Sequence, residues 1–156
     1  MIVILENIRS AHNVGSIFRT ADAVGAEGIV LVGVTPAPAD KFGRPQPEIA
    51  KTALGAEKNI PWRQAKTARP VIAKLKKDGY LIIALEQSEK SKDIRRFVPP
   101  KNGKFAVVLG SETEGVSKAI LSSSDEIIEI PMFGRKESLN VSVAFGIIAY
   151  ASLLNK

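Results

Sequence analysis

Short, continuous runs of apolar residues recur along the chain. Many of their residues are β-branched, and apolar and polar positions do not alternate within them. Such runs are typical of strands that are buried on both faces of a parallel sheet. Five strands are therefore predicted, over residues 2–5, 28–32, 80–85, 105–109 and 126–130.

Between these runs, apolar residues recur at helical spacing. Helices are predicted over residues 14–24, 64–77, 115–121 and 141–154. The last of them is apolar over much of its circumference, which is typical of a core or interface helix. The alternation of strands and helices predicts an α/β fold with a mostly parallel sheet and helices on both faces.

Two stretches lack these patterns. Residues 34–61 are rich in proline, which excludes a long regular element and predicts a loop that passes over the sheet. Residues 90–104 are basic and are interrupted by a Pro–Pro pair. No internal repeat is visible, so a single domain over residues 1–156 is expected.

Charge and composition narrow the classes of partner. The 22 Lys and Arg residues against 16 Asp and Glu give a net charge of +6, which favours a polyanionic partner such as a nucleic acid. There is no cysteine and His12 is the only histidine, so no metal is expected. No apolar stretch reaches the ~20 residues that a membrane span needs, and a cytoplasmic protein with no membrane partner is expected.

The first polar constellation runs from Asn13 to Arg19 and opens the helix that follows the first strand. This is the edge at which α/β sheets bind ligands. Asn13 is predicted to cap the helix. An alternative needs no ligand, because Gly15 could serve close packing and Arg19 could pair with Asp22 one turn later.

The second constellation, Leu109 to Gly115, directly follows a buried strand. Free backbone N–H groups and a carboxylate there could line a pocket. Ser111 and Glu114 also match the S-x-x-E capping box that begins many helices, although the box leaves Glu112 unexplained.

The third constellation, Ile130 to Ala144, contains a strand end, a Pro/Gly turn and the start of the last helix, which Ser138 or Asn140 could cap. Each of the three segments follows a buried strand or opens a helix. Together they predict one composite ligand pocket at the carboxyl edge of the sheet.

In their order and separation, these segments resemble the signature motifs of the SpoU/TrmH branch of the SPOUT methyltransferases. The motif patterns are N-x-G-x-x-x-R, L-G-x-E-x-x-G and I-P-M-x-G…S-L-N-V-S-V-A, and the resemblance spans nearly the whole chain. One departure is Ser111, where the second motif usually has Asn. The resemblance implies a deep C-terminal trefoil knot and a homodimer whose active sites receive groups from both subunits.

The resemblance also implies that S-adenosylmethionine is the cofactor and that its methyl group goes to a ribose 2′-hydroxyl of a folded RNA, tRNA in preference to rRNA. The matching catalytic positions are Arg19, Asn13, Glu112, Ser138 and Asn140. The matching cofactor-binding positions are Leu109, Gly110, Ser111, Glu112, Gly115, Ile130, Pro131, Met132, Ser138, Leu139 and Asn140. Contacts with RNA are expected from Arg9, Arg19, Arg44, Arg135 and Lys136, which can neutralise phosphate charge.

Two roles are open for Arg19. It could take the proton of the 2′-hydroxyl, although a guanidinium holds its own proton very firmly. It could instead stay charged, clamp the neighbouring phosphate and stabilise negative charge on the reacting oxygen. Two other functions also stay open on the same fold, a non-enzymatic RNA-binding or assembly protein and a base-methylating enzyme.

Overall fold

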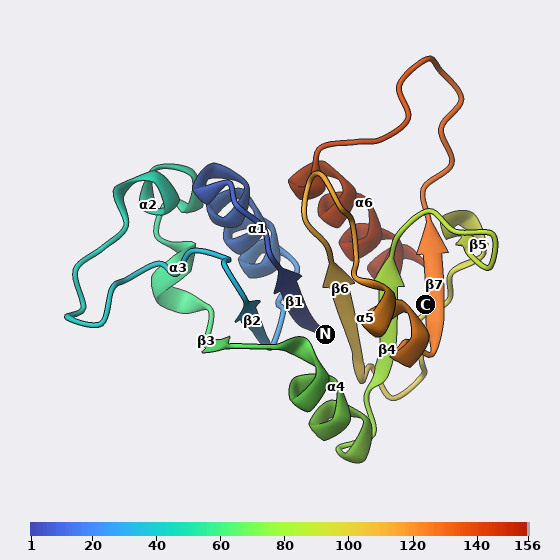
Figure 1. The fold of residues 1–156 in the computed structure, drawn as a ribbon, viewed down its shortest axis with the longest axis horizontal. Helices are drawn as coiled ribbons and strands as arrows, with labels where there is room; N and C mark the ends of the chain where they lie inside the picture. Colours follow the sequence, from blue (N-terminus) through green and yellow to red (C-terminus); the bar gives the residue numbers. More distant parts are fainter. Residues whose placement is uncertain (156) are drawn as a thin grey trace.

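Seven parallel strands form the centre of the structure, a computed structural model that describes residues 1–155. Their order across the sheet is β3-β2-β1-β6-β4-β7-β5 (Figure 1). The strands are β1 (Ile2–Glu6), β2 (Gly28–Val32), β3 (Trp62–Ala65), β4 (Leu81–Leu85), β5 (Lys92–Asp93), β6 (Phe105–Leu109) and β7 (Glu126–Glu129). The helices are α1 (Ala11–Ala23), α2 (Pro47–Ala53), α3 (Ala56–Asn59), α4 (Ala68–Lys77), α5 (Lys118–Ser123) and α6 (Val141–Leu154), with a 3-10 turn η1 (Ile94–Arg96).

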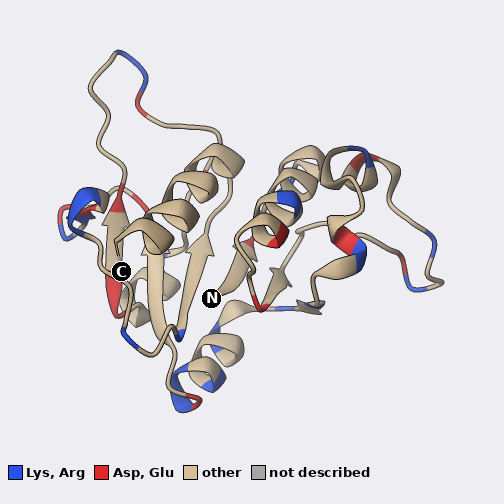
Figure 2. Cartoon of the chain, turned by 180° about the vertical axis from the view of Figure 1, so that it is seen from behind, with Lys and Arg blue, Asp and Glu red and all other residues tan. Residues whose placement is uncertain are grey.

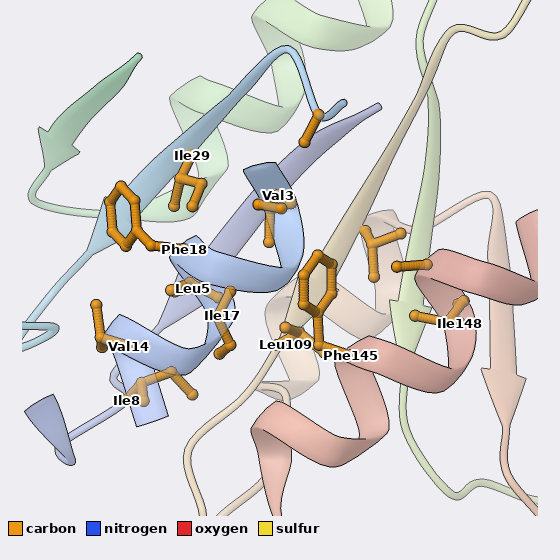
Figure 3. Close-up of a cluster of buried hydrophobic side chains, with 14 of the residues drawn as sticks. Val3, Leu5, Ile8, Val14, Ile17, Phe18, Ile29, Leu109, Phe145 and Ile148 are labelled. Carbon is orange, nitrogen blue, oxygen red and sulfur yellow. The ribbon is translucent and has the colours of Figure 1, made fainter. Parts of the chain in front are cut away.

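Helices cover both faces of the sheet, as predicted. On one face α1, α2, α3 and α6 share a core with the sheet, and Figure 3 shows Phe18 of α1 and Phe145 of α6 within it. On the other face α4 and α5 pack against residues such as Ile4 and Val108. Successive residues of one strand thus enter two different cores, which explains why the strands read as unbroken apolar runs.

Several element boundaries differ from the predicted ones. Helix α1 begins at Ala11, because Ser10 and not Asn13 caps it; Ser10 Oγ accepts a hydrogen bond from the N–H of Asn13 at 3.2 Å. Residues 64 and 65 belong to β3, so the helix predicted from residue 64 begins only at Ala68. Strand β3 is short, and its Arg63 and Gln64 are exposed, so no apolar run marks it in the sequence.

The capping box predicted at Ser111 does not begin a helix. The N–H of Glu114 donates to Ser111 Oγ at 3.0 Å, but the backbones of Ser111 and Gly115 also bond to each other at 2.9 and 3.2 Å. The chain closes there into a tight turn, and α5 begins at Lys118 instead of residue 115.

Residues 34–61 contain no long element, as predicted, but they do contain the short helices α2 and α3. The family's C-terminal trefoil knot stays a prediction, since strand order alone does not establish it.

Helices α1 and α2 approach each other closely at Gly15. A Cβ atom on Gly15 would overlap Thr52 Oγ1 and the carbonyl oxygen of Ile49, both in α2. Thr52 Oγ1 also donates to the carbonyl oxygen of His12 at 3.0 Å, which ties α2 to α1. The glycine therefore sets the distance between the two helices.

We expect Gly15→Ala to lower the free energy of unfolding by about 1–3 kcal/mol, because the added methyl group forces two packed backbones apart. Urea unfolding followed by circular dichroism measures the change. Gly134→Ala is the matched control, since a Cβ at Gly134 would have nothing within 4 Å. A Gly15→Ala variant as stable as the wild type would contradict the close approach.

Candidate functional site

A pocket of about 560 Å³ opens at the carboxyl ends of β4, β6 and β7. These strands are neighbours in the sheet and point toward the same edge (Figure 1). The loops after β4 and β6 and the long loop between β7 and α6 therefore meet around one space. Ten of the eleven predicted cofactor-binding residues line it: Leu109, Gly110, Ser111, Glu112, Gly115, Ile130, Met132, Ser138, Leu139 and Asn140.

The prediction and the pocket differ in two respects. Pro131 is not among the lining residues. The wall formed by Leu85, Glu86 and Gln87 was missed, although two polar residues directly after a buried strand could have indicated it. The other lining residues without a prediction are Thr113, Glu129, Glu137, Val141 and Ala144.

Two carboxylates hold the loop that follows β6. Glu86 accepts a hydrogen bond from the N–H of Val116 at 2.8 Å, and the buried Glu6 accepts from both the N–H and the hydroxyl of Ser117 at 2.9 Å. Gly115 has a φ of +69°, and a Cβ there would overlap the Glu86 carboxylate. These contacts, made by side chains of β1 and of the loop after β4, fix the course of the loop.

A chain of hydrogen bonds joins all three motifs at the rim of the pocket. Asn13 Nδ2 donates to Glu112 Oε1 at 3.0 Å, and Asn140 Nδ2 donates to Asn13 Oδ1 at 3.0 Å. Asn140 Oδ1 accepts from the N–H of Ser142 at 2.9 Å and so caps α6, one of the two caps considered from the sequence. The N–H of Arg9 donates to the second Glu112 oxygen at 3.3 Å.

The pocket is acidic. Its lining, which lies wholly within residues 1–155, includes Glu86, Glu112, Glu129 and Glu137 but no Lys, Arg or His. Partial burial opposes ionisation of Glu112, but hydrogen bonds from Asn13 and from backbone N–H groups outweigh it, and the pKa of Glu112 lies below its ordinary value. Glu112 is thus ionised at neutral pH, and the site suits a ligand with positive charge.

Arg19 lies outside this pocket. It is exposed on α1 and lines a second cavity, and no ion pair joins it to Asp22 within the described residues. The chain itself therefore brings Asn13, Glu112 and Asn140 together by hydrogen bonds. Ser138 lies in the same pocket, but Arg19 stays apart.

The predicted RNA-contacting residues are all exposed but do not form one patch on the chain. Arg135 and Lys136 lie on the loop between β7 and α6, whereas Arg44 lies on the loop between β2 and α2, at the opposite end of the molecule (Figures 1 and 2). Arg44 pairs with Asp40 at 2.7 Å. Arg9 lies beside Glu112, to which its backbone N–H donates a hydrogen bond.

Residues 1–155 contain no group of three or more His, Cys, Asp or Glu residues that could hold a metal ion. No helix in this part of the chain is long and apolar enough to cross a membrane.

Residues 1–150 match the SpoU rRNA Methylase family. The chain belongs to this family. The resemblance drawn from the three motifs is thereby confirmed, and the parallel sheet with helices on both faces is the fold of the solved SpoU structures.

Relatives and solved structures match nearly all of this chain. A Bacillus subtilis (strain 168) protein, provisionally named TrmH family tRNA/rRNA methyltransferase YacO, is 34% identical over 95% of this chain and 56% of its own length. The AdoMet-bound rRNA methyltransferase from Sinorhizobium meliloti is 31% identical with a TM-score of 0.84, over 96% of this chain and 54% of that one. The TrmH/SpoU tRNA modifying enzyme from A. aeolicus is 31% identical with a TM-score of 0.81, over 96% of this chain and 72% of that one. The chain thus spans about half the length of the curated relatives it matches.

The lowered pKa of Glu112 predicts how acid affects the site. Its hydrogen bonds stabilise the fold at pH values above 4.5, the ordinary pKa of a glutamate. This stabilisation is lost as the pH falls through the lower pKa that Glu112 has in the folded state. Urea midpoints of the wild type and Glu112→Gln should therefore differ by a constant amount above about pH 5 and converge in stronger acid. Glu114→Gln is the control, because that side chain takes no part in these hydrogen bonds. A difference that does not change with pH would contradict the role of the Glu112 charge.

Proposed function

We propose that this chain is an RNA methyltransferase that uses S-adenosylmethionine to methylate a ribose 2′-hydroxyl of tRNA or rRNA. The observation that carries the proposal is the acidic pocket in which the three motifs converge. The AdoMet-bound rRNA methyltransferase from Sinorhizobium meliloti supports the same choice of cofactor.

The pocket fits this cofactor in charge and in shape. S-adenosylmethionine has two positively charged groups, a sulfonium and an ammonium, and only one carboxylate. Its net positive charge matches the four glutamates that line the pocket. Leu109, Ile130 and Leu139 offer apolar surface to an adenine ring, and the backbone of the fixed loop offers hydrogen bonds. When bound there, the cofactor supplies an electrophilic methyl group on its sulfonium sulfur.

The acceptor must be held in line with that methyl group and must lose its proton. The hydrogen-bonded chain of Asn13, Glu112 and Asn140 is well placed to orient a ribose hydroxyl at the rim of the pocket. Because its pKa is lowered, Glu112 is a weak base, so we assign it to orientation rather than proton abstraction. We assign to Arg19 the clamping of a phosphate and the stabilisation of charge on the 2′-oxygen.

A homodimer would bring Arg19 to the pocket. Helix α6 exposes an apolar stripe on one face, formed by Val143 (51% exposed), Ile147 (37%), Tyr150 (48%) and Leu154 (80%). The stripe lies beside α1, and Tyr150 lines the same cavity as Arg19. We propose that two subunits pack through the stripe, and that Arg19 of one subunit serves the pocket of the other.

Transfer of labelled methyl groups from S-adenosylmethionine to total RNA tests the function. We expect alkali-resistant product, because a methylated 2′-oxygen cannot cleave the adjacent phosphodiester. Arg19→Ala should lower transfer at least about 100-fold, since it removes a group that stabilises the reacting oxygen. It should leave cofactor binding unchanged, because Arg19 lies outside the pocket.

Arg63→Ala is the matched control, because Arg63 is an exposed arginine on the distant edge strand β3. Label in alkali-sensitive nucleotides would indicate base methylation. Failure to bind S-adenosylmethionine saturably would indicate a non-enzymatic RNA-binding protein.

Complementation tests the dimer. Arg19→Ala and Glu112→Ala should each be inactive, but co-expressed together they should recover about a quarter of wild-type activity, because half of the dimers are mixed and each mixed dimer has one intact site. Ile147→Asp should yield monomers in sedimentation and abolish the recovery. Active monomers, or no recovery in mixed dimers, would contradict shared sites.

A further inference from the structure

The second cavity, of about 500 Å³, lies between α1, α2 and α6. Its polar lining residues are Ser16, Arg19, Thr20, Lys51, Thr52 and Tyr150. No carboxylate is among the residues that line it, all of which belong to the described part of the chain. The cavity is therefore cationic, in contrast to the acidic pocket at the carboxyl edge of the sheet.

Neither cation of this cavity is neutralised by a carboxylate in the part of the chain that the structure describes. Within residues 1–155, Arg19 and Lys51 take part in no ion pair. Asp22 and Glu48, each one turn away on α1 and α2, are exposed and do not line the cavity. Two like charges that face one space repel each other, and an anion between them would relieve that repulsion. Hydroxyl groups in the same lining can donate hydrogen bonds to the anion.

Packing builds the cavity without help from a ligand. The close approach at Gly15 and the hydrogen bond from Thr52 to His12 fix α2 against α1. Lys51 immediately precedes Thr52, so these same contacts hold its backbone opposite Arg19. The two cations are thus placed by the core of the fold, which is the arrangement of a preorganised site.

We propose that this cavity binds a phosphate and that Lys51, together with Arg19, holds a backbone phosphodiester of the RNA beside the methylated ribose. The identity of the RNA rests on the proposed function, whereas the anion site rests on the cavity itself. Lys51 supplies a point charge, and the planar guanidinium of Arg19 supplies directional hydrogen bonds. Sharing the phosphate with Lys51 leaves Arg19 able to face the reacting oxygen as well.

Titration with inorganic phosphate tests the site without RNA or cofactor. Amide shifts of Ser16, Thr20 and Thr52 in nitrogen-15 spectra should change saturably in the wild type. Lys51→Ala should weaken the apparent affinity about fivefold, because a charge-assisted contact is lost, and Lys51→Arg should largely retain it. Lys58→Ala, an exposed lysine on α3 outside the cavity, is the control. No saturable change in the wild type, or equal affinity in Lys51→Ala, would overturn the proposal.

Steady-state methylation separates Lys51 from Arg19. Lys51→Ala should raise the KM for RNA about tenfold with a smaller effect on kcat, and should lower the salt dependence of RNA binding by about one ion. Arg19→Ala should act mainly on kcat. An unchanged KM and salt dependence in Lys51→Ala would overturn the phosphate site while the wild-type reaction still supported the proposed function. A wild type that binds phosphate in this cavity but methylates no RNA would support the phosphate site and overturn the proposed function.

Discussion

Burial of the sheet from both sides is the constraint on which the rest of this structure depends. Every residue of β2 and β6 is buried, because successive side chains enter the two separate cores that the helices form on the sheet. With both faces covered, polar loops gather at the edges of the sheet. Parallel strands end at the same edge, so motifs that are about a hundred residues apart in sequence meet around one pocket.

Charge is divided between two cavities, and α1 connects them. Asn13, in the first turns of the helix, binds Glu112 and Asn140 at the acidic pocket. Arg19, six residues and roughly 9 Å further along the helix, lines the cationic cavity with Lys51. A cofactor with positive charge would then bind in the acidic pocket, and a phosphate of the RNA would bind in the cationic cavity. Neither ligand would have to displace a group that the other needs.

The sequence predicted what depends on local patterns and failed where a distant contact decides. The five strands with unbroken apolar runs were found, whereas the polar edge strand β3 was not. The capping box at Ser111 is a sound local signal. However, Glu86 and Glu6 accept hydrogen bonds from the backbone N–H groups of Val116 and Ser117, and the helix begins only at Lys118. Most of the pocket lining was found through the motifs. Lys51 belongs to no motif, and only the packing of α2 on α1 reveals its place.

The spacing of the first motif, N-x-G-x-x-x-R, now has a physical explanation. On an α-helix Gly15 and Arg19 are four residues apart and share one face, whereas Asn13 points well away from both. Both faces of α1 make contacts, since Asn13 binds the loops of the pocket and Gly15 packs closely against α2. The absent side chain at Gly15 is what allows α2 to lie close enough to carry Lys51 to the cavity of Arg19. The motif thus specifies a packing contact as well as two polar side chains, and that contact extends the site to a residue outside the motif.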